Sequence, residues 1–297
     1  MKPESSQEFL FKPVQHLGPP KIFPPPENGK LSIAVRFVIP GLTSKKKEEL
    51  ARLAHRCGID LWGVDFENVT NKTQQSGILV TFCLYIPLPD EEDSFVVEAT
   101  ARLLVERYLG LLSFCTGLKL SKVALQLLTS KNGEIFHTIL PMGSRAPSPP
   151  RRHQIPAEIL TGKEISEAVY SALFWLRRGL AERDPIETFS ALMVSLQIMA
   201  SELGPLHKVT PCVRCLVTEV LKEEKILFDD LWNMRNAVVA HGNKTVTAEV
   251  LVKLTELKFE AGRLVYKALN LALDIPEDRL VKPDAAFYIT DTFMYDD

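Results

Sequence analysis

A proline-rich segment between residues 141 and 156 limits what this chain can fold into more than any other feature of its sequence. It holds five prolines in sixteen residues and shows no hydrophobic period. Proline fixes φ and removes a backbone hydrogen-bond donor, so neither a helix nor an inner strand continues through such a stretch. Because the chain has 297 residues, about twice the commonest domain size, we expect a Pro-rich linker at 141–158 with one domain on either side.

The residues before this linker carry both strand and helix patterns. Four apolar, β-branched runs favour strands, at 31–39, 78–87, 123–128 and 134–140. The pair Asn132-Gly133 favours a hairpin turn between the last two. Helical spacing of apolar residues favours two helices, at 44–58 and 94–114. The sequence therefore predicts a mixed α+β domain at 31–140, preceded by a Pro-rich extended leader at 1–30.

The residues after the linker keep helical periodicity to about Asp274. Five helices are expected, at 163–182, 186–203, 211–224, 226–241 and 247–273. In the last of them, apolar residues recur three and four apart from Val250 to Leu271, and Thr247 is a suitable N-cap. The predicted fold class is an α+β N-terminal domain followed by an all-α helical bundle at 159–275, with a C-terminal tail at 276–297.

Composition narrows the classes of function. The 35 Lys and Arg residues nearly balance the 37 Asp and Glu residues, so bulk positive charge cannot hold nucleic acid and any such contact must be local. The five cysteines are few for this length, which favours a reducing compartment. The start of the chain does not resemble a signal peptide, and no run of 18 apolar residues occurs. We therefore expect a cytoplasmic protein with no membrane partner.

The most informative segment is the expected helix at 226–241. One face is predicted to be buried by the spacing of its apolar residues Leu227, Leu231, Met234 and Val238. Gly242 suits the position just past a helix end. Arg235, Asn236 and His241 are left to explain. On an ideal helix, six residues correspond to a separation of about 120° around the axis and roughly 9 Å along it, so Arg235 and His241 share a face only if the helix unwinds at its end. An ordinary structural role also stays open, because a C-terminal histidine can satisfy helix carbonyls.

The pattern Arg235-Asn236-x4-His241-Gly242, followed by a long amphipathic helix, resembles the Arg-x4-6-His signature of the HEPN (higher eukaryotes and prokaryotes nucleotide-binding) domain. It is similar in particular to the branch called Apea-like, which includes proteins labelled methylamine-utilisation J-type. The resemblance covers about residues 160–275. It implies a HEPN-like bundle and, where members are active, a metal-independent ribonuclease without a cofactor. It also implies a homodimer whose two motif helices face each other across a composite cleft.

These residue types suit cleavage of RNA through its own 2′-hydroxyl. That reaction needs a base, an acid, and positive charge on the phosphorane. In a symmetric dimer His241 would be the acid or base, Arg235 would clamp the phosphate, and Asn236 would orient the phosphate or His241. The leading hypothesis is an endoribonuclease acting on RNA. A non-catalytic bundle for dimerisation or for nucleotide or RNA binding stays open, and an accessory role in amine utilisation rests only on the family label.

Two further groups of residues carry weaker hypotheses. His207, Cys212 and Cys215 have the spacing of metal ligands, but a closed structural zinc site needs a fourth. With Thr210-Pro211 as the start of a helix, we expect the two cysteines to be small buried apolar residues, with a degenerate zinc site or a redox pair as alternatives. Four acidic residues of the expected bundle have separate expected roles. Asp229 and Asp230 are expected to cap the motif helix, whereas Glu187 and Glu202 are weak candidates for orienting Arg235 or His241.

Overall fold

The computed structural model of this chain describes residues 31–40, 47–58, 61–70, 76–86, 94–116, 125–131, 134–140, 155–182, 184–204, 206–207, 210–240 and 247–283. In the strands, the backbone alone is described. The chain divides into two compact units. The first comprises Met1–Tyr108 and Leu118–His153, and the second comprises Leu109–Gly117 and Gln154–Asp297. The second unit therefore takes a short segment from the first half of the sequence.

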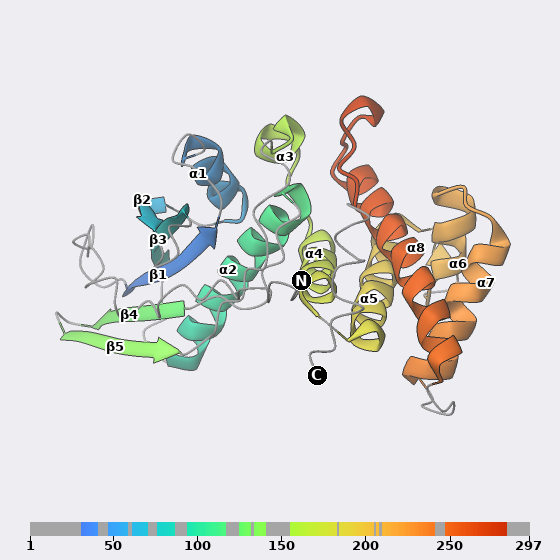
Figure 1. Ribbon diagram of the computed structural model, residues 1–297. Coiled ribbons are helices and arrows are strands. Elements are labelled where there is room, and N and C mark those ends of the chain that lie inside the picture. The colour runs from blue at the N-terminus through green and yellow to red at the C-terminus, as the bar shows by residue number, and fades with distance from the viewer. Residues whose placement is uncertain are drawn as a thin grey trace, which may run out of the picture. The chain divides into compact units, whose positions relative to one another are not determined.

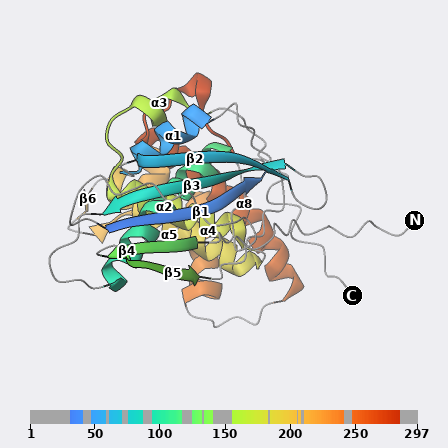
Figure 2. The same cartoon turned by 90° about the vertical axis from the view of Figure 1, so that its left-hand side faces the viewer.

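The first unit contains five strands. They are β1 (Leu31–Pro40), β2 (Leu61–Thr70), β3 (Ser76–Ile86), β4 (Leu125–Lys131) and β5 (Glu134–Leu140). Their backbones pair antiparallel in the order β2-β3-β1-β4-β5, as Figure 2 shows. β1 and β3 pair along most of their length, from Leu31 opposite Ile86 to Pro40 opposite Gly77. β4 and β5 form a hairpin in which Lys131 lies opposite Glu134.

Two helices accompany these strands in the chain, α1 (Lys47–Arg56) and α2 (Ser94–Thr116). The apolar spacing of α1 predicted its buried side correctly, since four residues of that spacing have at most 1% of their surface exposed: Leu50, Leu53, Ala54 and Cys57. Gly58 follows with φ of +74°, a backbone conformation that glycine adopts without strain. Its N–H donates to the carbonyl of His55 and closes the helix end.

The second unit is built from helices. They are α3 (Ala157–Thr161), α4 (Glu167–Ala181), α5 (Pro185–Leu203), α6 (Val213–Cys215), η3 (Leu216–Val220), α7 (Lys225–Met234), η4 (Arg235–Ala240), α8 (Ala248–Ala272) and η5 (Glu277–Arg279). The segments η3 and η4 are π-helical. A short hairpin of β6 (Leu206–His207) and β7 (Thr210–Pro211) precedes α6. In the helical unit, α5 packs against both α4 and α8 (Figure 1).

Side chains at the helix starts stabilise α4, α5 and α8. The hydroxyl of Ser166 accepts from the N–H of Val169 at the start of α4, and the carboxylate of Asp184 accepts two N–H groups at the start of α5. Thr247, the predicted N-cap of α8, accepts from the N–H of Val250 at 3.3 Å. Each cap satisfies donors that have no partner inside the helix, an effect worth about 1 kcal/mol.

The end of α2 belongs to the core of the helical unit. Gly110 lies so close to α4 that a Cβ atom at this position would be 3.1 Å from the Cβ of Leu173. One helical turn later, the ring of Phe114 stacks on that of Tyr266 in α8, with the ring centroids 5.1 Å apart. All side chains of residues 111–116 are buried. Residues 109–116 thus fill space between helices that come much later in the sequence.

The fold class expected from the sequence was wrong. In the part of the chain whose side chains the structure describes, 81% of the residues are helical and none lies in a strand, so an α+β N-terminal domain followed by a separate bundle is not supported. What the described side chains support is a helical bundle that includes the last turns of α2. The sequence pattern assigned all of α2 to the preceding domain. A continuous apolar helix gives no sequence signal of the point at which its residues leave one hydrophobic core and enter another.

The described helices contain no candidate for a membrane span. None is both long enough and apolar enough to cross a bilayer.

Candidate functional site

The motif residues lie where the α-helix α7 changes into the π-helix η4. Of the four apolar residues predicted to face the core, Leu231 is buried, whereas Leu227, Met234 and Val238 are half-buried. At Arg235 the backbone changes to i→i+5 hydrogen bonding. Single turns of this kind are rare and are often found at functional sites. The motif is therefore part of a locally distorted, incompletely buried helix end.

Arg235 is held on two sides by its own helix. Its Nη1 donates to Oδ1 of Asn236 at 3.0 Å, and its guanidinium carbon lies 5.1 Å from the ring centroid of Trp232. Trp232 in turn stacks with Phe228, with ring centroids 5.7 Å apart and an interplanar angle of 23°. Phe228, Trp232 and Arg235 form a continuous row along α7, which we call the α7 stack. All three side chains are half-buried.

Within the described residues, most of the hydrogen-bonding capacity of Arg235 is unused. A guanidinium has five N–H donors, and within the described residues Arg235 donates to Asn236 alone and forms no ion pair. A cation over an aromatic ring gains about 0.5–2 kcal/mol, depending on its exposure. The charge of Arg235 is thus oriented but not neutralised by any described carboxylate. The planar guanidinium presents parallel N–H donors, an arrangement that fits two oxygens of a phosphate.

His241 lies outside the described residues, as does Gly242. The structure therefore brings together two of the three predicted catalytic residues, Arg235 and Asn236. Trp232 was not among the predicted site residues, although the spacing of Phe228, Trp232 and Arg235 by four and three residues is visible in the sequence. Residues with this spacing lie on one face of a helix.

The acidic residues near the motif do not have the predicted roles. The prediction that Asp229 and Asp230 cap the motif helix was wrong, because α7 begins at Lys225 and its first turn contains no acidic residue. Instead Asp229 lies 3.8 Å from the amine of Lys225, and Asp230 lies 3.5 Å from that of Lys253 in α8.

The two weak acidic candidates are placed elsewhere in the helical unit. Glu202 accepts a hydrogen bond from the hydroxyl of Ser166 at 2.8 Å. Glu187 lies in the first turn of α5, where its N–H donates to the N-cap Asp184. Neither makes a polar contact with Arg235 among the described residues.

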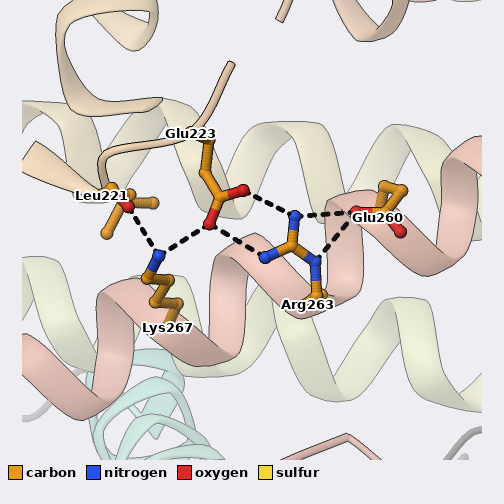
Figure 3. A network of polar contacts seen from close by, with 5 residues as sticks. All are labelled: Leu221, Glu223, Glu260, Arg263 and Lys267. Atoms are coloured by element: carbon orange, nitrogen blue, oxygen red, sulfur yellow. Dashed lines mark hydrogen bonds and ion pairs between the residues drawn. The ribbon is translucent and has the colours of Figure 1, made fainter. Parts of the chain in front are cut away.

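An ionic cluster holds the turn that leads into α7 (Figure 3). Both oxygens of Glu223 accept from Arg263 of α8 at 2.9 Å, and Lys267 donates to Glu223 and to the carbonyl of Leu221, each at 2.6 Å. Arg263 also donates to Glu260 at 2.8 Å. The Arg263 hydrogen bond is the main cause that lowers the pKa of Glu223 from its ordinary 4.5 to about 2, against desolvation that raises it; Lys267 adds to the lowering.

This cluster was missed at the sequence level. Arg263 and Lys267 are four residues apart and so share one face of α8. That spacing was the only available signal, since their partner Glu223 lies about forty residues earlier, in a turn. The cluster connects the end of η3 to α8 just before α7 begins.

The structure joins Cys212 and Cys215 in a disulfide. The preferred interpretation, two buried apolar thiols, was therefore wrong, and the expected helix start was wrong as well. Thr210-Pro211 forms β7, whereas Cys212 is the N-cap of α6. A zinc site is not supported in this state, because a disulfide offers no thiolate ligands. The side chain of His207 lies outside the described part, within which no group of three or more His, Cys, Asp or Glu residues could hold a metal ion.

Comparisons of the chain with protein-family models, with curated proteins and with solved structures found no match. Among the described residues, the chemical groups that lie together at the motif are the guanidinium of Arg235, the amide of Asn236 and the ring of Trp232.

Proposed function

We propose that the helical unit is a HEPN-like RNA-processing module in which Arg235 and Asn236 bind a phosphate of RNA. One observation supports this most directly: Arg235 is held by Asn236 and Trp232, yet has no carboxylate partner among the described residues. A structural arginine is usually paired, because a partly desolvated charge is costly without a partner. An arginine that is oriented and left without a counter-ion suits an anionic ligand.

The proposed reaction is metal-independent cleavage of RNA. A base removes the proton of the 2′-hydroxyl, which attacks the neighbouring phosphorus, and an acid protonates the departing 5′-oxygen. Arg235 stabilises the charge on the crowded phosphorane, and Asn236 keeps the guanidinium oriented. His241 supplies proton transfer. Since one chain has a single His241, the acid and the base come from two copies, so the partner is a second copy of this chain.

The activity is tested on total RNA in buffer containing EDTA, by gel analysis of fragments and chemical analysis of their ends. We expect fragments with 2′,3′-cyclic phosphate ends. Arg235→Ala and His241→Ala are each expected to lower the rate by roughly 100-fold, the usual size of a lost acid, base or oxyanion contact. Arg178→Ala is the matched control, because Arg178 lies 5.4 Å over Trp175 on α4 and its loss removes a similar cation–ring contact from another helix.

The outcomes separate the two functions considered for this bundle. Cleavage that persists undiminished in His241→Ala rejects the mechanism. RNA binding that requires Arg235, with no cleavage by the wild-type protein, identifies the bundle as a non-catalytic binding module. A mass measurement by light scattering tests the dimer, and a monomer at working concentration contradicts the composite site. We place this function in the cytoplasm, as the sparse cysteines suggest.

A further inference from the structure

The cysteine pair before η3 has no role in the proposed RNA chemistry. Cys212 and Cys215 are joined in a disulfide, with their Cα atoms 5.2 Å apart. Disulfides between cysteines three positions apart close a very small loop, so they restrict the unfolded chain little. Structural stabilisation is therefore a weak reason for this bond. Pairs with this spacing are typical of thiols that exchange electrons.

The two cysteines differ in exposure. Cys212 is partly exposed, whereas Cys215 has 6% of its surface exposed. An incoming thiol can therefore reach the sulfur of Cys212 more easily than that of Cys215. The remaining described cysteines, Cys57 and Cys115, are buried in their own units with at most 1% exposed. Among the described cysteines, exchange with a partner in solution is thus directed to Cys212.

The local backbone gives the sulfur of Cys212 a hydrogen-bond donor. Its Sγ accepts from the N–H of Cys215 at 3.2 Å, and its carbonyl accepts from the N–H of Leu216, so the chain continues directly into α6 and η3. The exposed Arg214 stands between the two cysteines in the sequence. An N–H donor and a neighbouring cation favour a cysteine as the reacting partner in exchange once the bond is open. A partly exposed cysteine bonded to a buried second cysteine is the arrangement that thiol–disulfide exchange requires.

We propose that Cys212 and Cys215 form a thiol–disulfide exchange site, in which Cys212 reacts with the partner and Cys215 resolves the intermediate. In reduction, a thiolate of an external dithiol attacks Sγ of Cys212, the Cys212–Cys215 bond breaks, and Cys215 leaves as a thiolate that takes up a proton. The second thiol of the reductant then displaces Cys212 and leaves as a cyclic disulfide. Two electrons and two protons pass to the pair. Oxidation by a disulfide substrate follows the same steps in reverse.

The test is a redox titration of the full chain followed by peptide mapping. The protein is equilibrated in buffers of reduced and oxidised dithiothreitol, acid-quenched, alkylated and digested with trypsin. Because Arg214 separates the cysteines, they appear on two peptides, 209–214 and 215–222, which are linked only when oxidised. We expect both peptides to change together in one two-electron transition, while the labelling of the Cys57 and Cys115 peptides is the same in every buffer, because both residues are buried during the equilibration. A bond that persists until the protein unfolds overturns the proposal, as does a pair found as two thiols in every buffer.

The order of the steps is tested with oxidised glutathione. Cys215→Ser lacks the resolving thiol, so Cys212 is expected to accumulate a mixed disulfide, about tenfold more than Cys215 does in Cys212→Ser. Equal adducts in both variants, or more on Cys215, overturn the assigned roles. The wild-type titration does not depend on either variant folding, so it decides the existence of the site by itself.

Discussion

The guanidinium carbon of Arg235 lies 5.1 Å from the ring centroid of Trp232, which places a cation over an aromatic face one helical turn away. If this contact orients Arg235, Trp232→Ala should weaken RNA binding by about 2- to 5-fold, the equivalent of a partly exposed cation–ring contact of 0.5–1 kcal/mol. Trp232→Phe should retain most of the affinity. Fluorescence anisotropy with labelled single-stranded RNA measures both.

The control for this prediction is Trp175→Ala, which removes the ring beneath Arg178 on α4. It should leave RNA affinity unchanged. Thermal melts of all variants distinguish a positioning role from loss of fold. Equal loss of affinity in Trp232→Ala and Trp175→Ala would contradict a specific role for the α7 stack.

Glu223→Gln should destabilise the protein at neutral pH by about 1 kcal/mol, the usual upper range for a partly exposed ion pair. The pKa of Glu223 is lower in the folded chain, about 2, than its ordinary 4.5, so the ionised form stabilises the fold. This contribution is complete above pH 4.5 and is lost as the pH falls towards 2. Urea unfolding of both proteins at pH 7 and pH 3.5 should show a smaller difference at the lower pH. Glu219→Gln, an exposed change on η3, should show no such dependence.

Asn270→Ala should cost about 2–3 kcal/mol, because it leaves buried backbone groups without partners. Asn270 has only 3% of its surface exposed, donates to the carbonyls of Tyr266 and Val281 at 2.7 Å, and accepts from the N–H of Val281 at 2.8 Å. Chemical denaturation measures the change. Asn233→Ala, at an exposed position of α7, is the control and should stay within about 0.5 kcal/mol of the wild type. A similar result for both would show that the contacts with Val281 contribute nothing.

Gly110→Ala should lower the free energy of unfolding. This is expected although alanine is by itself more favourable than glycine within a helix, by about 1 kcal/mol. The new Cβ would lie 3.1 Å from the Cβ and 3.3 Å from the carbonyl carbon of Leu173, so α2 and α4 would have to move apart. Thermal denaturation tests this. Ser171→Ala, at an exposed position of α4, serves as the control. A rise in melting temperature for Gly110→Ala would show that the contact relaxes without cost.

The helices after the linker were the most predictable part of the chain. The expected helix at 247–273 is α8 at Ala248–Ala272, and Thr247 is its N-cap. Within its apolar stripe, Leu254, Leu257 and Leu264 are buried, whereas Leu271 is 48% exposed. The bounds and the buried face of a long amphipathic helix can be predicted because the spacing of its apolar residues and its capping residues are local features of the sequence. Leu271 departs from the pattern because it lies in the last turn, where no described element covers it.

Features that depend on distant residues were not predictable. The change to a π-helix at Arg235, the fixing of the turn by Glu223 and the burial of Asn270 all depend on neighbours far away in the sequence or on backbone geometry. The cysteine pair shows a further limit. Its spacing allowed three interpretations, and only the bond between the two sulfurs argues against two of them, the pair of buried thiols and the zinc site. For the candidate site, the sequence predicted which residues take part, but it did not predict which residues they contact.

The course of α2 has a consequence for recombination of the gene that encodes this protein. Its last turns, including Gly110 and Phe114, complete the core formed by α4 and α8, and yet they precede the proline-rich segment. A recombination event at that segment would transfer the later helices without the piece that fills their centre. The helical unit is thus discontinuous in the sequence. Recombination that transfers it complete has to include the codons of the preceding helix.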